Sequence, residues 1–306
     1  MNLMNYNWKD MRNYQFKLVD VFTEKPLQGN LLPVVMEADD LSDDEMHAIA
    51  REFNSSETTF VLKPRDEKAA WRLRSFTPKA EVFGAGHNAL GACWAIAENN
   101  PVDLKEGKNV VYQEIGESVL PLEIYVESGK IEKILMTQDT PVFGEKFTDI
   151  KALAETLNLD ETVFAVESIE PQAVSTGAFH FLVPVKNIEA LKNVQPDPNK
   201  LAALAKPLGC EGCYLYTLET VEADSAVHTR AFFPGIGISE DPATGTAAGP
   251  LAALLVSKGI LSEGETLIIE QGFEINRPSR IEVLVSGSVV KVGGKCISVG
   301  EGNLKL

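Results

Sequence analysis

Runs of β-branched and aromatic residues alternate with helical patterns through the first third of the chain. The run Phe16–Phe22 is typical of a strand, because Val19 and Val21 favour extended backbone. Ser42 is a good N-cap and Glu45 follows three residues later, so a helix is expected to begin there. Further strands are expected at Leu31–Met36, Thr58–Leu62 and Trp71–Phe76, and a helix of small residues at Gly86–Ala97.

The same order of landmarks recurs in the second half of the chain. SFTP (75–78) is followed by a glycine-opened helix, GHNALGACWAIA, and FFP (232–234) by another, GTAAGPLAALLV. Before them, GNLLPVV (29–35) is similar to GAFHFLVPV (177–185). This repetition indicates an internal duplication, with two similar domains facing each other across a pseudo-twofold axis. The alternative is a generic chain of strands and helices. In the second half a helix is expected at Asn199–Leu208 and strands at Cys213–Thr217 and Val227–Phe233.

The two glycine-opened helices suggest a site for an anion. The first turn of a helix has free backbone N–H groups and a partial positive charge, and glycine lets a ligand approach them closely. If the halves face each other, Gly86-His87 and Gly245-Thr246 present two such ends to one cleft. A carboxylate could be held there without lysine or arginine. The competing interpretation is that small residues only allow tight packing, which we prefer for Ala89 and Ala247.

Composition narrows the function classes. The 306 residues carry a net charge of −16, which argues against nucleic-acid binding. No run approaches the roughly 18 apolar residues that a membrane span needs. The chain has four cysteines and begins without an export signal, so a cytoplasmic protein with reduced thiols is expected. The glycine spacing also fits neither a dinucleotide fingerprint nor a P-loop.

Four motifs together resemble one known family. SSETTF (55–60), FTPKAEVFGAGHNALG (76–91), EDPATGTAAG (240–249) and EQGFEINRPS (270–279) are similar to segments of the phenazine-biosynthesis PhzF-like proteins, in the expected order. The resemblance implies the diaminopimelate epimerase-like fold. This is an α+β fold of two pseudo-twofold-related domains, each a mixed β-sheet wrapped around a central helix. It also implies a homodimeric isomerase that needs no cofactor and acts on a small carboxylate.

The resemblance assigns roles to particular residues. Glu57 matches the family's general acid/base, and Asp241 its second acidic site residue. Gly86 and His87 match a pair that lines the substrate pocket, and Gly245 with Thr246 matches a Gly-Ser pair. The expected halves are residues 1–140 and 141–306, with a linker near Gln138–Gly144 and a last strand that can cross over to the first half. A carboxyl group with a pKa raised by burial could then take a proton from one carbon and return it to another.

Two departures from related enzymes limit the alternatives. Diaminopimelate epimerases and related racemases have a cysteine just before each helix-opening glycine, whereas this chain has Ala85 and Thr244. A racemase that uses two thiols is therefore disfavoured. The remaining alternative is a binding or regulatory module that keeps the cleft without turnover, although Glu57, His87 and Asp241 favour an enzyme.

Other residues that could carry chemistry are set aside. Cys210 and Cys213 form a C-x-x-C, but neither a second pair nor spaced histidines accompany it, so no metal site is expected. His180 and His228 fall in expected strands. There they are interpreted as packed or hydrogen-bonded residues rather than ligands.

Overall fold

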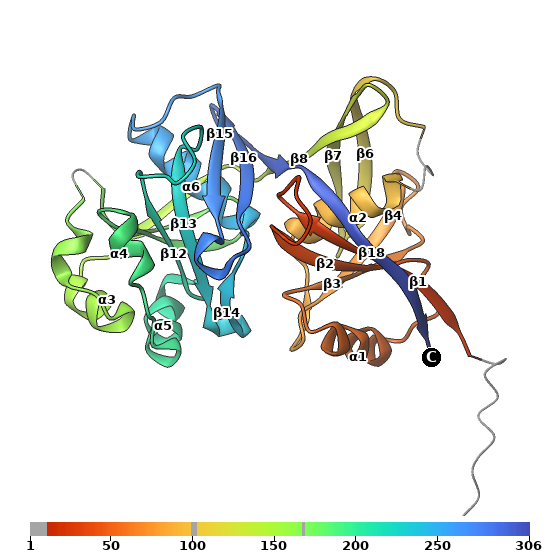
Figure 1. Ribbon diagram of the computed structural model, residues 1–306, viewed down its shortest axis with the longest axis horizontal. Coiled ribbons are helices and arrows are strands. Elements are labelled where there is room, and N and C mark those ends of the chain that lie inside the picture. The colour runs from red at the N-terminus through yellow and green to blue at the C-terminus, as the bar shows by residue number, and fades with distance from the viewer. Residues whose placement is uncertain (1–10, 99–102, 167–168) are drawn as a thin grey trace, which may run out of the picture.

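The computed structural model describes residues 11–98, 103–166 and 169–306, and shows an α+β protein with two lobes (Figure 1). In the first lobe the strands are β1 (Asn13–Val21), β2 (Asn30–Val35), β3 (Thr58–Leu62), β4 (Trp71–Phe76), β5 (Glu81–Val82), β6 (Gly107–Ile115), β7 (Ser118–Glu127) and β8 (Lys130–Gln138), with helices α1 (Asp43–Phe53) and α2 (His87–Glu98).

The second part of the chain repeats this order after β9 (Val142–Lys146). Its strands are β10 (Gln172–Ser175), β11 (Phe179–Pro184), β12 (Cys213–Thr217), β13 (Val227–Phe233), β14 (Ile238–Asp241), β15 (Thr266–Gln271), β16 (Ser279–Ser286), β17 (Val289–Gly294) and β18 (Cys296–Lys305). Its α-helices are α3 (Ile150–Leu157), α4 (Ile188–Lys192), α5 (Pro198–Ala205) and α6 (Gly245–Ser257), with short 3-10 turns at Glu161–Phe164, Lys206–Leu208, Pro234–Ile236 and Phe273–Ile275.

Strand pairing repeats from one half to the other. In the first half β2 is antiparallel to β1 and parallel to β3, and β4 is antiparallel to β3 and parallel to β6. In the second half β11 pairs in the same way with β10 and β12, and β13 with β12 and β15. A repeated pattern of parallel and antiparallel pairs is not expected of a generic chain. The fold is therefore two similar, pseudo-twofold-related domains.

One strand crosses between the halves. β9 pairs with β10, which lies in the same half. β18, at the end of the second half, crosses over to the first half, as the sequence predicts, and pairs with β1 along its whole length (Figure 1). β8 and β17 pair antiparallel between the halves. The connection from β8 to β9 is shorter than the linker expected at Gln138–Gly144, and the division at residues 140 and 141 remains a prediction.

A buried helix lies at the centre of each half. α2 contacts strands β1, β2, β3, β4, β8 and β18, and α6 contacts β10, β11, β16 and β17. A helix that is apolar on all sides can be buried on all sides, and nearly every residue of both helices is buried. Small residues permit this packing: a Cβ atom on Gly91 would lie 2.7 Å from Leu32 Cδ2 and 2.8 Å from Val21 Cγ2.

Local signals in the sequence explain the ends of the elements around the site. Ser42 and Glu45 form the expected capping box at the start of α1, and Asn54 ends that helix in the left-handed conformation with a φ of 49°. Residues 54–57 then connect α1 to β3. This four-residue connection faces the second half. Among the residues that the structure describes, no helix is both long and apolar enough to cross a membrane.

Candidate active site

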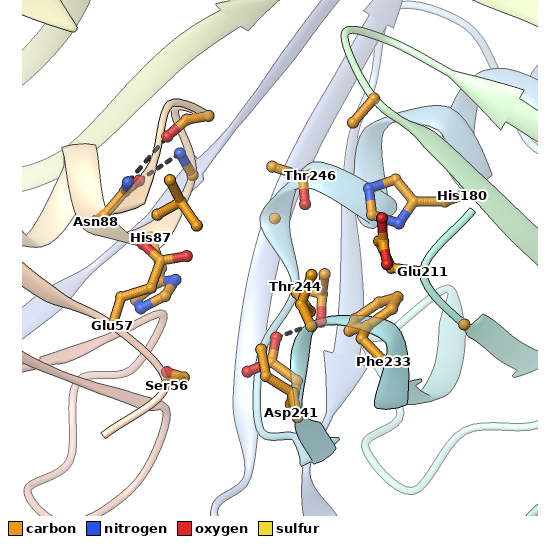
Figure 2. Close-up of a pocket in the computed structure, with 18 of the residues that line it drawn as sticks. Ser56, Glu57, His87, Asn88, His180, Glu211, Phe233, Asp241, Thr244 and Thr246 are labelled. Atoms are coloured by element: carbon orange, nitrogen blue, oxygen red, sulfur yellow. Dashed lines mark hydrogen bonds between the residues drawn. The ribbon is translucent and has the colours of Figure 1, made fainter. Parts of the chain in front are cut away.

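A cavity of about 400 Å³ lies between the two halves, and Figure 2 shows the side chains on its walls. Glu57 lies on the N-terminal wall and Asp241 on the opposite, C-terminal wall (Figure 2). The structure thus brings together every site residue predicted from the sequence, since all of them line this cavity: Glu57, Gly86, His87, Asp241, Gly245 and Thr246.

The N-terminal ends of α2 and α6 meet at this cavity. A Cβ atom on Gly86 would lie 3.3 Å from Thr246 Cγ2, so the two helix entries are nearly in contact. Within the described residues, the backbone N–H groups of His87, Asn88, Gly245 and Thr246 have no hydrogen-bond acceptor. Both helix ends carry partial positive charge. The arrangement can therefore bind a carboxylate through backbone donors alone.

Glu57 carries a buried carboxyl oxygen on the opposite side of the cleft from Asp241. It is the last residue before β3, and Ser55 Oγ donates a hydrogen bond of 2.6 Å to its carbonyl oxygen. Glu57 Oε2 is buried and has no hydrogen-bond partner among the described residues. Burial, and secondly the negative charge of Asp241, raise the pKa of Glu57 to about 8. A carboxyl group with that pKa can act as acid and as base near neutral pH.

Asp241 is held by hydrogen bonds from both halves. Asn30 Nδ2 donates to Asp241 Oδ1 at 2.9 Å, and Thr244 Oγ1 donates to Asp241 Oδ2 at 2.6 Å. Ser56 Oγ in turn donates to Asn30 Oδ1 at 3.0 Å, which links the residue before Glu57 to Asp241. Burial raises the pKa of Asp241 to about 6, although both hydrogen bonds oppose that rise. These contacts fix the Asp241 carboxyl group and link it to the segment that precedes Glu57.

His87 is neutral in this environment. Its side chain is buried at the start of α2, and Nε2 has no hydrogen-bond partner within the described part of the chain. Burial lowers the pKa of His87 to about 4, since no carboxylate compensates the charged form. A neutral imidazole can donate or accept one hydrogen bond at the cavity wall, depending on its tautomer.

Comparison with known proteins identifies the family. Residues 19–302 match the family described as phenazine biosynthesis-like protein. The chain belongs to that family. It is 34% identical to a trans-2,3-dihydro-3-hydroxyanthranilate isomerase of Pseudomonas aeruginosa, over 96% of this chain and 100% of the relative.

Solved structures agree with this assignment. The crystal structure of a PhzF-family phenazine biosynthesis protein of Bacillus anthracis superimposes with a TM-score of 0.87 at 29% identity, covering 96% of this chain and 99% of the other. A hydroxyproline epimerase from Agrobacterium vitis has a TM-score of 0.67 at 16% identity, covering 96% of this chain and 93% of the other, which shows a shared fold alone. The chain is therefore an isomerase of the phenazine biosynthesis-like family with an epimerase-like fold.

An asparagine, Asn88, follows His87 in the helix-opening motif GHNALG (86–91). Asn88 Oδ1 accepts hydrogen bonds from the N–H groups of Gly86 and Ala89, at 2.7 and 2.8 Å. Asn88 Nδ2 donates to Gly84 O at 2.9 Å. The side chain thus caps its own helix and fixes the glycine loop. The N–H groups of His87 and Asn88 remain without an acceptor among the described residues, and both residues line the cavity.

The positions of racemase cysteines carry no thiol in this chain. Thr244 uses its hydroxyl to donate to Asp241, and Ala85 has no polar side chain. Cys210 lines the cavity, but burial raises the pKa of its thiol to about 12, so it stays protonated. These observations disfavour proton transfer between two thiols, as the sequence predicts.

Several residues that build the site could not be assigned a role from the sequence. Gln271 Nε2 donates to Asp241 O at 2.6 Å, and its Oε1 accepts the N–H of Thr244 at 3.0 Å. Asn30 lies in the segment GNLLPVV and Gln271 in the motif EQGFEINRPS. Neither stretch of sequence indicates a role for these two side chains. His180 is packed, as the sequence predicts, since its ring lies edge-on against Phe233. It also lines the cavity, and its Nε2 has no partner among the described residues.

Proposed function

We propose that this family member is a cofactor-independent isomerase that moves a proton between carbons of a small carboxylate-bearing substrate, with Glu57 as the general acid/base. The observation that carries the proposal is the buried, unpartnered carboxyl oxygen of Glu57 in a cavity where two helix N-termini meet. The proton transfer itself needs only an acid/base and a site that stabilises the charge that develops.

The proposed reaction has two proton transfers. Ionised Glu57 takes a proton from a carbon of the substrate, and the electron pair of that C–H bond delocalises into the carboxylate as a dienolate-like species. The free N–H groups at the starts of α2 and α6 stabilise the added negative charge. Protonated Glu57 then returns the proton to a different carbon. The rearranged double bonds are left in the product, and the enzyme regains its initial state.

Asp241 and His87 are proposed to orient the substrate. Asp241 is fixed by Asn30 and Thr244, so its carboxyl group can accept a hydrogen bond from a substrate hydroxyl or amine. Neutral His87 can supply one further hydrogen bond beside the carboxylate. Because the isomerase of Pseudomonas aeruginosa is named for trans-2,3-dihydro-3-hydroxyanthranilate, that compound is the first substrate to test.

The first prediction concerns Glu57→Gln, which keeps the shape of the side chain and removes its acid/base capacity. Turnover of the true substrate should fall by about 10³-fold or more. The measurement is product formation followed by proton NMR, over small carboxylates beginning with trans-2,3-dihydro-3-hydroxyanthranilate. Glu52→Gln, an exposed position on α1, is the matched control and should retain native turnover. Retained activity of Glu57→Gln would contradict the role of this residue.

We also propose that the enzyme is a homodimer in the cytoplasm. All four cysteines are free and buried, which is in keeping with a reducing compartment. Light scattering after size-exclusion chromatography measures the assembly, and twice the chain mass of 33.4 kDa is the expected result.

A further inference from the structure

A buried glutamine lies behind the second carboxyl group of the site, that of Asp241. Gln271, at the end of β15, is fully buried and is not among the described residues that line the cavity. Its side chain makes hydrogen bonds to Asp241 and Thr244, and Tyr214 Oη donates to its Oε1 at 3.0 Å. A side chain in this place cannot touch the substrate, so any effect on the reaction passes through its neighbours.

Backbone groups on both sides fix the orientation of the Gln271 amide. Its Oε1 accepts the N–H of Thr244 at 3.0 Å, and a backbone N–H can only donate. Its Nε2 donates to the carbonyl oxygen of Asp241 at 2.6 Å, and a carbonyl oxygen can only accept. Exchanging the oxygen and the nitrogen of the amide would set donor against donor and acceptor against acceptor. The second hydrogen on Nε2 is therefore donated to Thr244 Oγ1, at 3.0 Å.

This donor sets the direction of the next hydrogen bond. Within the described residues, Thr244 Oγ1 has two partners, Gln271 Nε2 and Asp241 Oδ2, the latter at 2.6 Å (Figure 2). Because Oγ1 accepts from Gln271, the hydroxyl hydrogen of Thr244 is left to donate to Asp241 Oδ2. A proton on Asp241 Oδ2 would face that hydroxyl hydrogen. The Thr244 hydroxyl thus favours the ionised form of Asp241.

The other oxygen of Asp241 also accepts a hydrogen bond. Asn30 Nδ2 donates to Asp241 Oδ1 at 2.9 Å and to Ala243 O at 2.9 Å, which fixes the Asn30 amide as the donor. Glu57 Oε2, in contrast, has no hydrogen-bond partner in the described part of the chain. Burial raises the pKa of Asp241 to about 6 against its two hydrogen bonds, and that of Glu57 to about 8. The two carboxyl groups therefore differ in the direction that the hydrogen bonds require.

We propose that Gln271 is a positioning residue that keeps Asp241 ionised through the hydroxyl of Thr244. The one proton that the two carboxyl groups hold near neutral pH then rests on Glu57, the residue that must deliver it. This inference rests on the proposed function, which makes Glu57 the acid/base. Other titratable groups around Asp241 are His87, His180, Cys210 and Glu211 on the cavity walls, Tyr214 behind Gln271, and Arg230 on β13, which pairs with Glu240.

The titration of Asp241 tests this role. Gln271→Leu removes the amide, and Thr244→Val removes the hydroxyl without opening the space that Gln271 fills. In each variant the lower step in the profile of kcat/KM should move up by about one pH unit, since Asp241 loses a hydrogen bond to its charged form. Carbon-13 NMR of protein labelled at the aspartate carboxyl carbons should show the same displacement without any turnover. Asp241→Asn assigns the signal.

Two controls separate this role from a structural one. Thr244→Ser keeps the hydroxyl and should keep the native position of the step. Gln172→Leu removes a buried amide that donates to Gly144 O at 2.8 Å outside the cavity, and should also leave the step in place.

A loss of activity or stability in Gln271→Leu and Thr244→Val, with the step and the carboxyl titration unmoved, would overturn the positioning role. An equal displacement in Gln172→Leu would overturn it as well. Retained turnover in Glu57→Gln would instead overturn the proposed function, and the NMR titration would still decide whether Gln271 acts on its neighbouring carboxyl group.

Discussion

At the scale of single residues, the surroundings of the Glu57 carboxyl group decide its chemistry. Its oxygen Oε2 has no hydrogen-bond partner among the described residues, and the second carboxyl group of the site, that of Asp241, lies across the cleft. The sequence motif SETTF indicates which residue carries the proton. The direction of its pKa shift is also expected from the sequence, since proton transfer between carbons requires a stronger base than an ordinary carboxylate, and burial raises the pKa to about 8. The contribution of Asp241 could not be predicted from that motif, because the two residues are far apart in the chain.

The pKa values predict how the rate depends on pH. Glu57 must be ionised to accept a proton, so kcat/KM should rise with pH and level off above about 8. The ionisation of Asp241, whose pKa is about 6, should add a step to the profile of kcat/KM at lower pH. Because the two carboxyl groups interact, both steps belong to the pair. A profile of kcat/KM between pH 5 and 10 checks this, and a rate that falls across this range would contradict it.

The raised pKa of Glu57 also predicts how the free energy of unfolding depends on pH. The pKa of Glu57 is higher in the folded protein than its ordinary value of 4.5, so its stabilising contribution is complete below pH 4.5 and is lost as the pH rises through about 8. Glu57→Gln should therefore be more stable than the native protein at pH 9, by on the order of 2 kcal/mol. This is less than the full shift implies, because the residue is partly exposed. Urea unfolding at pH 5 and pH 9 measures the difference.

At the scale of secondary-structure elements, the sequence predicts those elements best that depend on residues close together in the chain. The capping box of α1 and the strands β3, β4, β12 and β13 follow directly from capping residues and β-branched runs. The helix expected at Asn199–Leu208 ends earlier as α5 and continues as a 3-10 turn that contains Pro207, whose missing N–H cannot continue the helix. The two-residue strand β5 was not predicted, because two residues show no periodicity.

A buried cluster that joins β13, β15 and the following turn provides an element-scale prediction. His228 Nδ1 lies 2.6 Å from Glu270 Oε1, and its Nε2 lies 2.9 Å from Glu274 Oε1. Burial lowers the pKa of His228, but the hydrogen bonds to both glutamates outweigh it and raise the pKa to about 9. His228→Gln would leave two buried carboxylates without their cation, and should lower the free energy of unfolding by about 3 kcal/mol at pH 6.

The stability lost in His228→Gln should depend on pH, because the pKa of His228 is raised in the folded protein. The pKa of His228 is raised above its ordinary value of 6.5, so its contribution is complete below pH 6.5 and is lost as the pH rises through about 9. The difference between the native protein and His228→Gln should accordingly shrink between pH 6 and pH 10 in urea unfolding. His47→Gln is the matched control, since His47 makes a single hydrogen bond to a backbone carbonyl oxygen. An equal loss at both pH values would contradict a charged His228.

At the scale of the whole molecule, the site exists only because the halves are joined. Glu57 comes from the first half and Asp241 from the second, and the pairings of β18 with β1 and of β17 with β8 tie the halves together. The duplication could be inferred from recurring motifs. The pairing of β8 with β17 could not, because pairing between distant strands is set by the tertiary fold rather than by local preference. The positions of His180 and Glu211 on the cavity wall could not be predicted from the sequence for the same reason.

The most direct measurement of the central claim is deuterium incorporation at carbon. The native enzyme is incubated with substrate in heavy water, and recovered substrate and product are analysed by mass spectrometry and NMR. A base that exchanges its proton with solvent should place deuterium at the carbon that Glu57 reprotonates. Glu57→Gln should still bind the carboxylate but incorporate none. Incorporation by Glu57→Gln at the native rate would contradict proton transfer through this residue.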